Sequence, residues 1–380
     1  MKLRADTVVG LARHGLDLAK GTYPARWTAP VRSEARWSSE RAQAWWDQVG
    51  WLAGCNFTPS TAGNQLELWQ AETYDPETID RELGWAAELG FNSIRMFLHH
   101  LLMDDPGFHE RLDEVLGIAS SHGIGALLVL FDGCWNPEAR LGPQPSPRPG
   151  IHNSTWVQSP GFEVLSDPRR WPELRRYVVD TIERFTHDPR VHGWDLFNEP
   201  NGTSVYYPRT DARDKYRLAR ELLGQVFDWA QEVDPDQPLT TGVFLGTSGA
   251  VERGDPINQV MLGRSDVISF HSYLGRKRLD ATIDHLVAYG RPLLCTEWLG
   301  RPRSPANLIE VFADRDVAAY NWGLVDGRTQ TKYPWTSWQR PTTPDAPWFH
   351  ELLHPDGVPY DRREAELIRA TCLPRTRNGA

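Results

Sequence analysis

The chain has 380 residues, 40% hydrophobic and 24% charged, a balance typical of globular proteins and a length that fits a barrel fold with loop insertions. A formal net charge of −9 without a basic stripe argues against nucleic acid as a partner, and no apolar run approaches the roughly 20 residues that span a membrane. The 17 tryptophans are unusual. Because the flat face of an indole stacks well on sugar rings, they hint at a carbohydrate ligand.

The cysteines and the first residues bear on the compartment in which the protein works. The four cysteines are few and widely spread, unlike a disulfide framework, and none belongs to a CxxC pair that would suggest structural zinc. Residues 1–15 contain no apolar run long enough for the core of a secretory signal, so the sequence predicts a cytoplasmic location. His99 and His100 are adjacent, but no carboxylate or thiol lies at ligand spacing from them, and we predict no metal site.

Short apolar runs alternate with longer amphipathic stretches along the chain. The apolar runs predict eight strands, at residues 51–55, 92–98, 125–131, 191–197, 238–244, 266–270, 292–296 and 317–322. The amphipathic stretches, several of which start at Asp-Pro and stop at Gly, predict helices at residues 39–48, 75–89, 108–122, 167–185, 211–233, 279–289 and 305–313.

Eight strands separated by helices imply parallel pairing, and eight is the number that closes a (β/α)₈ TIM barrel. The competing fold is an open doubly wound sheet, which carries a glycine-rich phosphate turn after an early strand. The first strand here leads instead into Asn56-Phe-Thr-Pro-Ser-Thr61. We therefore predict an α/β fold with one catalytic barrel domain over residues 1–380, in which residues 1–50 form a short N-terminal extension packed on the barrel.

Two long connections are expected on the face where barrels keep their active sites. Residues 136–150 are rich in proline and glycine and follow the third strand, so they indicate a long βα loop and not a domain boundary. Residues 324–347, after the eighth strand, look like a second such loop. The cationic run Arg276-Lys-Arg278 is interpreted as a solvated loop.

Two glutamates end apolar strands. In Trp194-Asp-Leu-Phe-Asn-Glu-Pro200 the proline removes a ladder donor and ends the fourth strand, which places Glu199 at its tip. Glu297 ends the seventh strand in the same way. For a single glutamate a helix cap or a surface charge is the simpler explanation. Because a half-buried, unpaired carboxylate is expensive, two of them at strand tips of one barrel favour a functional pair that faces across its mouth.

A pair of carboxyl groups is what glycoside cleavage needs. One protonates the leaving oxygen while the other attacks the anomeric carbon, and when both act directly they stand about 5–5.5 Å apart and configuration is retained. The acid must hold its proton near neutral pH, so partial burial and the neighbouring carboxylate should lift its pKa from about 4.3. No cofactor is implied, since two carboxyls suffice.

An ordered set of strand-end motifs resembles glycoside hydrolase family 5, within the clan of barrel-shaped retaining glycosidases. The set comprises Asn198-Glu199-Pro200, His271-Ser-Tyr273, Glu297 and Trp322, and it spans essentially the whole barrel. The resemblance implies that Glu199 is the acid/base and Glu297 the nucleophile. It further implies a contact of Asn198 with the sugar 2-hydroxyl, Tyr273 and Arg95 against the nucleophile, His271 on the acid/base side, and Trp322 as the floor of the −1 subsite.

Each of these secondary roles has a plainer alternative. Arg95 would serve equally to neutralise buried carboxylates, and Trp322 would serve as ordinary core. His271 is more often a hydrogen-bonded strut than a proton carrier, and we favour the strut. Family 5 often shows a histidine after its third strand, where this chain has Phe131-Asp-Gly-Cys-Trp135. We expect Asp132 to take over part of that histidine's hydrogen bonding.

Further motifs are similar to the family 5 subfamily of β-mannosidases that act on the β-mannosyl-1,4-N-acetylglucosamine unit of N-glycan cores. These motifs are Cys55-Asn-Phe-Thr-Pro-Ser-Thr61, Leu66-Glu-Leu-Trp-Gln70, His152-Asn153-Ser-Thr-Trp156 and Arg328-Thr-Gln-Thr331. They imply substrate contacts from Trp135, Asn153 and Trp156. The stiff aromatic insertion 133–167 would wall off the cleft beyond the −1 sugar.

We therefore predict a retaining exo-β-mannosidase that cleaves a small oligosaccharide or disaccharide by double displacement. An endo-β-1,4-glycanase of mannanase, xylanase or cellulase type is the alternative, and a non-catalytic carbohydrate-binding barrel is a third interpretation. The sequence leaves the oligomeric state open.

Overall fold

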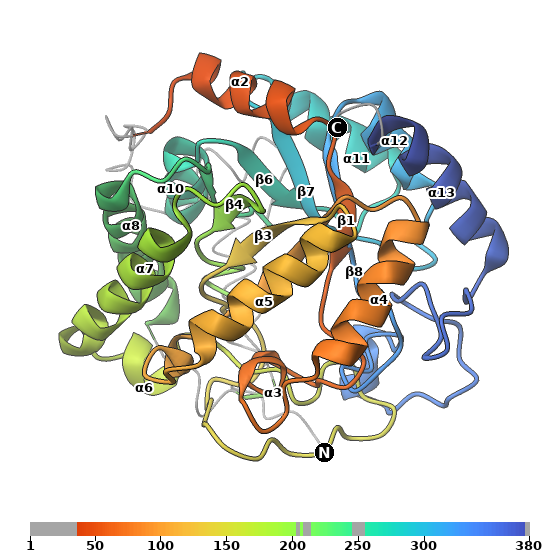
Figure 1. The fold of residues 1–380 in the computed structure, drawn as a ribbon, viewed down its shortest axis with the longest axis horizontal. Coiled ribbons are helices and arrows are strands. Elements are labelled where there is room, and N and C mark those ends of the chain that lie inside the picture. The colour runs from red at the N-terminus through yellow and green to blue at the C-terminus, as the bar shows by residue number, and fades with distance from the viewer. Residues whose placement is uncertain (1–35, 203–205, 208–213, 245–254, 377–380) are drawn as a thin grey trace.

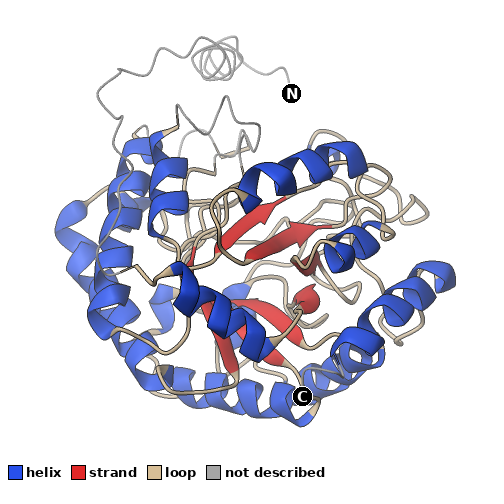
Figure 2. Cartoon of the chain, turned by 90° about the horizontal axis from the view of Figure 1, so that it is seen from above, coloured by secondary structure: helices blue, strands red, loops and turns tan. Residues whose placement is uncertain are grey.

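Eight parallel strands form the centre of the protein and helices surround them, as a computed structural model of residues 36–202, 206–207, 214–244 and 255–376 shows (Figures 1 and 2). The strands are β1 (Ala53–Asn56), β2 (Ser93–Phe97), β3 (Gly125–Val129), β4 (Val191–Asp195), β5 (Leu239–Thr240), β6 (Ile268–His271), β7 (Leu293–Trp298) and β8 (Ala318–Trp322). They are hydrogen-bonded in the order β5-β4-β3-β2-β1-β8-β7-β6.

The two ends of this order meet and close the ring. Val243, just beyond β5, forms a parallel bridge with Phe270 of β6. The amide of Val243 donates to the Ser269 carbonyl at 3.0 Å, and the amide of His271 donates to the Val243 carbonyl at 3.0 Å. The predicted (β/α)₈ barrel is confirmed. The predicted strand 238–244 is shorter than expected, because only Leu239 and Thr240 pair with β4.

The predicted helices are found in their predicted places. They are α2 (Ser39–Val49), α4 (Pro76–Glu88), α5 (Phe108–Ser121), α7 (Trp171–Phe185), α8 (Lys215–Val233), α11 (Arg276–Val287) and α12 (Leu308–Asp314). Their starts follow from local chemistry: the Asp75 side chain accepts from the Thr78 amide at the start of α4, and Pro76 needs no partner there. Residues 211–213 of the predicted helix 211–233 lie outside the described residues.

Three expectations about helices need correction. The run Arg276-Lys-Arg278, interpreted as a loop, is the first turn of α11, which begins after Gly275. The predicted helix 167–185 starts as a 3₁₀ turn, η2 (Pro168–Arg170), before α7. Several elements were not predicted: α3 (Gln65–Trp69), α6 (Phe162–Leu165), α10 (Pro256–Arg264), α13 (Arg362–Thr376), η1 (His100–Leu102) and η3 (Trp335–Trp338). Buried residues occur almost all round α10, so it carries no amphipathic stripe.

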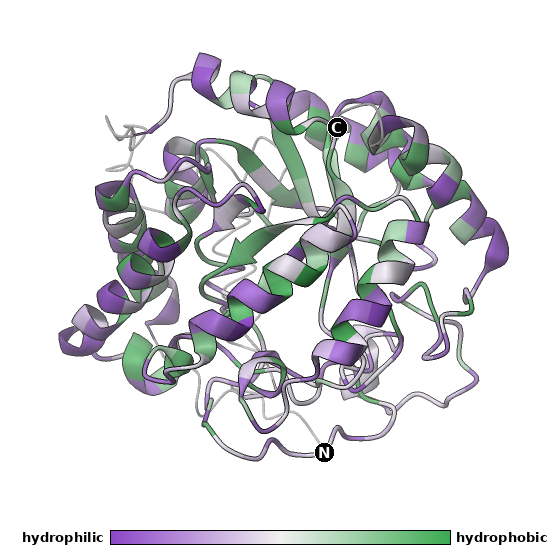
Figure 3. Ribbon diagram, in the orientation of Figure 1, coloured by the Kyte–Doolittle hydropathy of each residue, from purple (hydrophilic) through white to green (hydrophobic). Residues whose placement is uncertain are grey.

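Apolar side chains fill the barrel and the space between strands and helices, as the green strands of Figure 3 illustrate. Ten of the tryptophans are buried and belong to the packed interior: Trp37, Trp46, Trp51, Trp69, Trp156, Trp171, Trp194, Trp229, Trp298 and Trp348. Most of the tryptophan content is therefore structural. None of the described helices is both long and apolar enough to cross a membrane. The four cysteines, all within the described part, are free thiols.

Helix α2 packs at the N-terminal ends of the strands, away from the long loops (Figure 1). The Trp46 indole donates to Asp316, just before β8, at 2.8 Å, and the Trp37 amide donates to Asp266, just before β6, at 2.8 Å. Residues Trp37 and Trp46 thus contact the barrel, while the packing of residues 1–50 as an extension stays a prediction. That residues 1–380 form one domain stays a prediction.

Candidate active site

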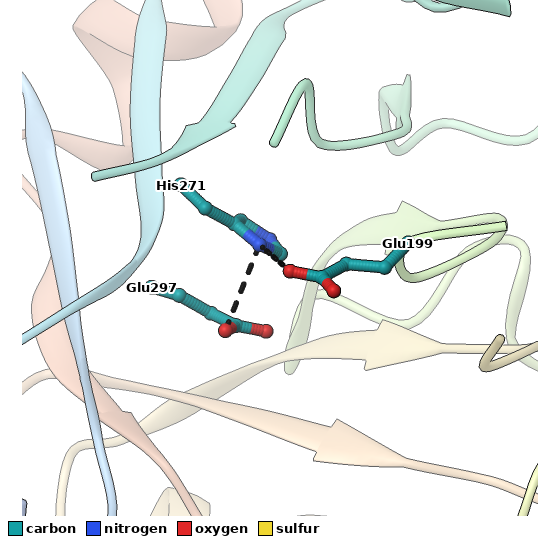
Figure 4. A group of neighbouring side chains, drawn as sticks. All are labelled: Glu199, His271 and Glu297. Atoms are coloured by element: carbon teal, nitrogen blue, oxygen red, sulfur yellow. Dashed lines mark hydrogen bonds and ion pairs between the residues drawn. The ribbon is translucent and has the colours of Figure 1, made fainter. Parts of the chain in front are cut away.

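The two glutamates lie at the carboxyl ends of their strands and face one another (Figure 4). Glu199 follows β4, Glu297 lies near the end of β7, and His271 ends β6 between them. One carboxylate oxygen of Glu199, one of Glu297 and a ring nitrogen of His271 all lie within 4.8 Å of one another. This spacing matches the carboxyl separation of about 5–5.5 Å in retaining glycosidases and is shorter than the 6.5–9.5 Å or so of inverting ones.

Glu297 is surrounded by charged and polar neighbours that contact its carboxyl directly. The Arg95 guanidinium lies 3.1 Å from its Oε1, the Tyr273 hydroxyl donates to its Oε2 at 2.9 Å, and its side chain is 7% exposed. Burial raises the pKa of Glu297, and the nearby His271, Arg95 and Tyr273 oppose that rise. Its two oxygens therefore have fixed partners and one of these carries a full positive charge.

Arg95 is the centre of a buried polar network and is itself fully buried. Besides Glu297, it donates to Asp195 at 2.8 Å, to the Asn56 side-chain oxygen at 2.7 Å and to the Asn198 side-chain oxygen at 2.7 Å. Both interpretations of Arg95 fit these contacts, because one guanidinium neutralises buried carboxylates and also orients Glu297 and Asn198.

Within the described part of the chain, the Glu199 carboxyl has no directly bonded cationic partner of this kind. Its Oε1 lies 2.8 Å from His271 Nδ1, and its Oε2 accepts from the Cys134 thiol at 3.3 Å. Burial raises the pKa of Glu199 to about 7, with the Cys134 hydrogen bond and the charges of Arg95 and Lys215 opposing the rise. A carboxyl in such surroundings holds its proton near neutral pH, which is the requirement for a general acid.

His271 lies between the two carboxyl groups as a neutral ring. Burial lowers the pKa of His271 to about 4. Its Nε2 is buried and has no hydrogen-bond partner among the residues that the structure describes, and a Cβ atom at Gly242 would come within 3.0 Å of it. The environment favours the strut over the proton carrier.

Asp132 lies behind the site and does not line its cavity. Its carboxylate accepts from the Asn198 side chain at 2.9 Å, from the Trp156 indole at 2.5 Å and from the Gln65 side chain at 3.2 Å. We expected Asp132 to take over hydrogen bonds within the −1 subsite. The structure instead places it one layer further back, where it orients two residues that do line the cavity.

A cavity of about 1320 Å³ opens at the strand ends. Nine of the predicted site residues line it: Trp135, Asn153, Trp156, Asn198, Glu199, His271, Tyr273, Glu297 and Trp322. Arg95 and Asp132 do not. The prediction omitted Cys134, His152, Tyr206, Phe244, Trp335, Phe349 and His350, which also line the cavity. His152 stood beside Asn153 in a quoted motif, Cys134 stood beside Trp135 in another, and the aromatic residues after position 332 were a further signal.

Aromatic rings surround the space above Glu297. The Trp322 ring lies 5.7 Å from Phe97 and 6.0 Å from Trp156, and its residue is only half-buried, which suits a sugar platform better than core. Trp135, from the loop after β3, stacks on Trp338, from the loop after β8, at 5.1 Å and 11°.

Three cavity residues have left-handed backbone conformations. The φ angles are 67° at Trp135, 50° at Asn153 and 40° at Glu199. Such conformations are costly for residues other than glycine, least so for asparagine, and they cluster where geometry serves a function. Strain at three positions of one cavity points to a site and not to ordinary loop packing.

Among the described residues, Glu199, His271 and Glu297 are also grouped closely enough to hold a metal ion. Their ligand atoms are already engaged, however. Glu297 carries the Arg95 guanidinium and the Tyr273 hydroxyl on its two oxygens, and His271 Nδ1 contacts Glu199. A cation there would face the fixed positive charge of Arg95, so the donor set fits a metal poorly.

Comparison with known proteins shows likeness in structure only. No family model and no curated protein matches the sequence. Among solved structures, the GH5_18 protein of Streptomyces cattleya, in complex with GlcNAc, is 16% identical, with 87% of this chain and 81% of that chain covered and a TM-score of 0.59. An exo-β-1,4-mannosidase from Opitutaceae bacterium strain TAV5 is 18% identical, with 87% and 60% covered and a TM-score of 0.58.

An endo-1,4-β-mannanase from Rhizomucor miehei is 12% identical, with 86% of this chain and 95% of that chain covered and a TM-score of 0.56. Exo- and endo-acting proteins thus lie at similar structural distance from this chain. At such identities the likeness establishes the fold: the chain has the (β/α)₈ barrel of these proteins.

Proposed function

We propose that this protein is a retaining β-mannosidase of glycoside hydrolase family 5, with Glu199 as acid/base and Glu297 as nucleophile. The observation that carries the proposal is the pair of facing carboxyls with unequal partners. Glu297 contacts a guanidinium at 3.1 Å, whereas the Glu199 carboxyl contacts a neutral imidazole and a thiol among the described residues. One group is thereby suited to attack as an anion and the other to deliver a proton.

The reaction proceeds in two displacements. Glu297 attacks the anomeric carbon while Glu199 passes its proton to the glycosidic oxygen, so the C–O bond breaks and the sugar becomes linked to Glu297. Glu199, now a carboxylate, takes a proton from water, whose oxygen displaces Glu297 and releases the sugar with its configuration retained. Arg95 and Tyr273 hold the Glu297 oxygens in line, since both contact them directly.

The sugar in the −1 subsite would lie on Trp322, with Asn198 at its 2-hydroxyl. Asn198 is well fixed for this role, because Arg95 donates to its oxygen at 2.7 Å and its nitrogen donates to Asp132 at 2.9 Å. A side-chain amide whose oxygen and nitrogen are both hydrogen-bonded is already ordered. It can therefore bind a substrate hydroxyl with little further loss of side-chain entropy.

Mannose is the proposed sugar, and Man-β-1,4-GlcNAc the proposed substrate. GH5_18 proteins of Streptomyces cattleya and of Bifidobacterium longum, both similar to this chain in structure, have been solved in complex with Manβ1-4GlcNAc. The subfamily motifs, including His152-Asn153-Ser-Thr-Trp156, support the same substrate.

The loop contacts favour exo action over endo action. The insertion between β3 and α7 is tied to the loop after β1, where Asn64 donates to the Thr155 carbonyl at 2.8 Å. It is also tied to the loop after β8: the Asn153 amide donates to the Thr329 carbonyl at 2.8 Å, and the Trp338 indole to the His152 carbonyl at 2.6 Å. Three loops joined in this way close one side of the cavity.

The cavity continues on the other side, toward β6 and α11. Leu274, Thr282 and His285 line it there, which leaves room for the leaving group. A polysaccharide chain needs space on both sides of the cleaved bond. In the proposed arrangement, the joined loops occupy the space on one of these sides. We propose rapid release of mannose from the disaccharide and little action on mannan.

An assay with an aryl β-mannoside and two variants tests the catalytic proposal. Glu199→Gln should lose about 10²–10⁴-fold in kcat/KM and regain rate with added azide or with a good leaving group, because only the acid step is damaged. Glu297→Gln should stay inactive under the same conditions, because no glycosyl-enzyme can form. Equal azide rescue of both variants, or an active Glu297→Gln, would contradict the assignment.

A substrate panel tests the exo proposal and separates the alternatives. Purified protein is given Man-β-1,4-GlcNAc, its β-gluco and β-xylo counterparts, mannan and xylan. The proposal expects the manno disaccharide to be cleaved fastest. Comparable specific activity on a polymer would favour the endo-glycanase, and binding of the disaccharide without cleavage would favour the non-catalytic barrel.

A further inference from the structure

Two buried side chains in the cavity wall have polar atoms that no group in residues 36–202, 206–207, 214–244 or 255–376 satisfies. Asn153 is 1% exposed, and neither its side-chain oxygen nor its nitrogen has a hydrogen-bond partner. His350 is 0% exposed, and its Nε2 has no partner. Both residues line the same cavity as Glu199 and Glu297. A buried polar group left unpaired costs about 1–3 kcal/mol, so these atoms call for a ligand or an explanation.

The backbone of Asn153 is held on both sides where this residue lines the cavity. Its backbone amide donates to the Thr329 carbonyl at 2.8 Å, and its carbonyl accepts from the Trp156 amide at 3.2 Å. Its φ of 50° is a conformation that asparagine tolerates better than other side-chain-bearing residues. The backbone is thus fixed on both sides while the amide has both a donor and an acceptor to offer.

His350 is held as a hydrogen-bond acceptor. Its Nδ1 contacts the Leu299 carbonyl, which can only accept, so Nδ1 carries the hydrogen and Nε2 carries the lone pair. Burial and the neighbouring His152 keep the pKa of His350 well below its ordinary value, and the ring stays neutral. The neutral acceptor therefore suits a hydroxyl group and gives no preference for an anion.

The ring of His350 is one side chain away from the proposed nucleophile. Its ring lies 5.5 Å from the ring of Tyr273, whose hydroxyl contacts Glu297 at 2.9 Å. It also lies 5.4 Å from His152, the residue before Asn153, in the part of the wall where the loops after β3 and β8 meet. Asn153 and His350 thus belong to the closed side of the cavity.

We propose that Asn153 and His350 recognise hydroxyl groups of the non-reducing terminal sugar, and so make the site specific for a chain end. The proposal rests on the proposed function. In a hexose ring C4 lies opposite C1, so a sugar with C1 at Glu297 turns its 3-, 4- and 6-hydroxyls toward the closed side. A β-1,4-linked chain has its next sugar on O4, where these two side chains would instead require a free hydroxyl.

The proposal is tested with 4-nitrophenyl β-mannoside and its 3-, 4- and 6-deoxy analogues. The measured quantity is the selectivity ratio, kcat/KM for the parent divided by kcat/KM for each analogue. The wild type should lose about tenfold or more on at least one analogue, because a pocket built for a hydroxyl leaves its polar atoms unpaired when that hydroxyl is missing.

Two variants remove the proposed contacts. Asn153→Gly keeps the left-handed backbone accessible and deletes the amide, and His350→Phe keeps an aromatic ring and deletes both nitrogens. Each should slow the parent substrate about tenfold and bring one selectivity ratio to within about twofold of unity, while the other ratios stay high. If His350→Phe does not fold, Asn153→Gly alone decides.

His100→Phe is the matched control. His100 is also buried and also has an unpartnered Nε2, but it does not line the cavity, and its Nδ1 contacts Ser159. It should keep all wild-type selectivity ratios. Wild-type ratios in Asn153→Gly and in folded His350→Phe would overturn the inference and leave the proposed function intact. Failure of the wild type to cleave any β-mannoside would instead overturn the proposed function.

Discussion

His271 Nδ1 lies 2.8 Å from Glu199 Oε1 and 3.6 Å from Glu297 Oε2. A single neutral ring thus stands between the two carboxyls, and its close contact goes to Glu199. Of the two glutamates, Glu297 is the one that contacts the Arg95 guanidinium, which it shares with Asp195. This unequal distribution of partners, and not the distance between the carboxyls, decides which of them keeps the proton in the proposed mechanism.

The first prediction concerns the pH dependence of activity. Burial raises the pKa of Glu199 to about 7, and the proposed acid works only when protonated. For an aryl mannoside, kcat/KM should therefore fall on the alkaline side with an apparent pKa of about 7. In Glu199→Gln, assayed with a good leaving group, this alkaline limb should be absent. A wild-type profile that stays flat from pH 6 to 9 would show that another group, or none, supplies the proton.

The second prediction concerns the thiol beside the acid. Cys134 donates to Glu199 Oε2 at 3.3 Å, and this hydrogen bond favours the ionised carboxylate. Burial raises the pKa of Cys134 well above its ordinary value, so it remains a thiol and a donor. Cys134→Ala should therefore move the alkaline limb of kcat/KM to higher pH, with less than about a tenfold change in rate at the optimum.

Two further variants separate this effect from mere packing. Cys134→Ser keeps a donor of similar size and should leave the limb nearer to the wild-type position. Cys372→Ala removes a buried thiol on α13, outside the cavity, and should leave the profile unchanged. A Cys134→Ala profile that overlays the wild type would mean that the thiol does not tune the acid.

How far the sequence allowed this site to be predicted depends on where each residue lies. Glu199 and Glu297 could be placed from the sequence because each ends an apolar run. The carboxyl ends of all the strands in a parallel barrel lie on the same face, so the two side chains were expected at one site. Trp322 could be predicted as a site residue for the same reason. His350 and Trp335 were not, because they stand in a long loop whose residues follow no periodicity and meet the strand ends only through the fold.

Contacts between loops could not be predicted from the sequence either. Asp132 lies behind the cavity, where three of its donors come from the segment after β1, from the residues that follow β4 and from the insertion after β3. No spacing in the sequence encodes that convergence. The first turn of α11 was missed because Arg276 and its neighbours are exposed and charged, which is also typical of a loop.

The third prediction concerns stability. The folded-state pKa of Glu199, about 7, exceeds its ordinary value of 4.5, so between these two values the folded protein binds more protons than the unfolded chain does. The free energy of unfolding therefore decreases as pH rises through this window. Glu199→Gln removes that loss, and at pH 8 it should be more stable than the wild type by about 1–3 kcal/mol, with little gain at pH 4.

Urea unfolding at pH 4 and pH 8 measures this difference. Glu88→Gln, at an exposed position on α4, controls for the substitution itself. A Glu199→Gln variant whose stability relative to the wild type is the same at both pH values would show that the carboxyl is not held in its neutral form. The expected gain in stability accompanies a loss of activity. Such a trade-off is common where the active site is itself destabilising.

The last prediction concerns the closed side of the cavity. Trp338 joins three loops: it stacks on Trp135 at 5.1 Å and on Tyr206 at 4.8 Å, and its indole donates to the His152 carbonyl. Trp338→Ala should loosen this wall, raising KM for Man-β-1,4-GlcNAc about tenfold with kcat within about threefold, because the carboxyl pair is untouched. Relative activity on mannan should rise. Trp85→Ala, on α4, should change neither, and an unchanged KM in Trp338→Ala would mean that the wall does not position the substrate.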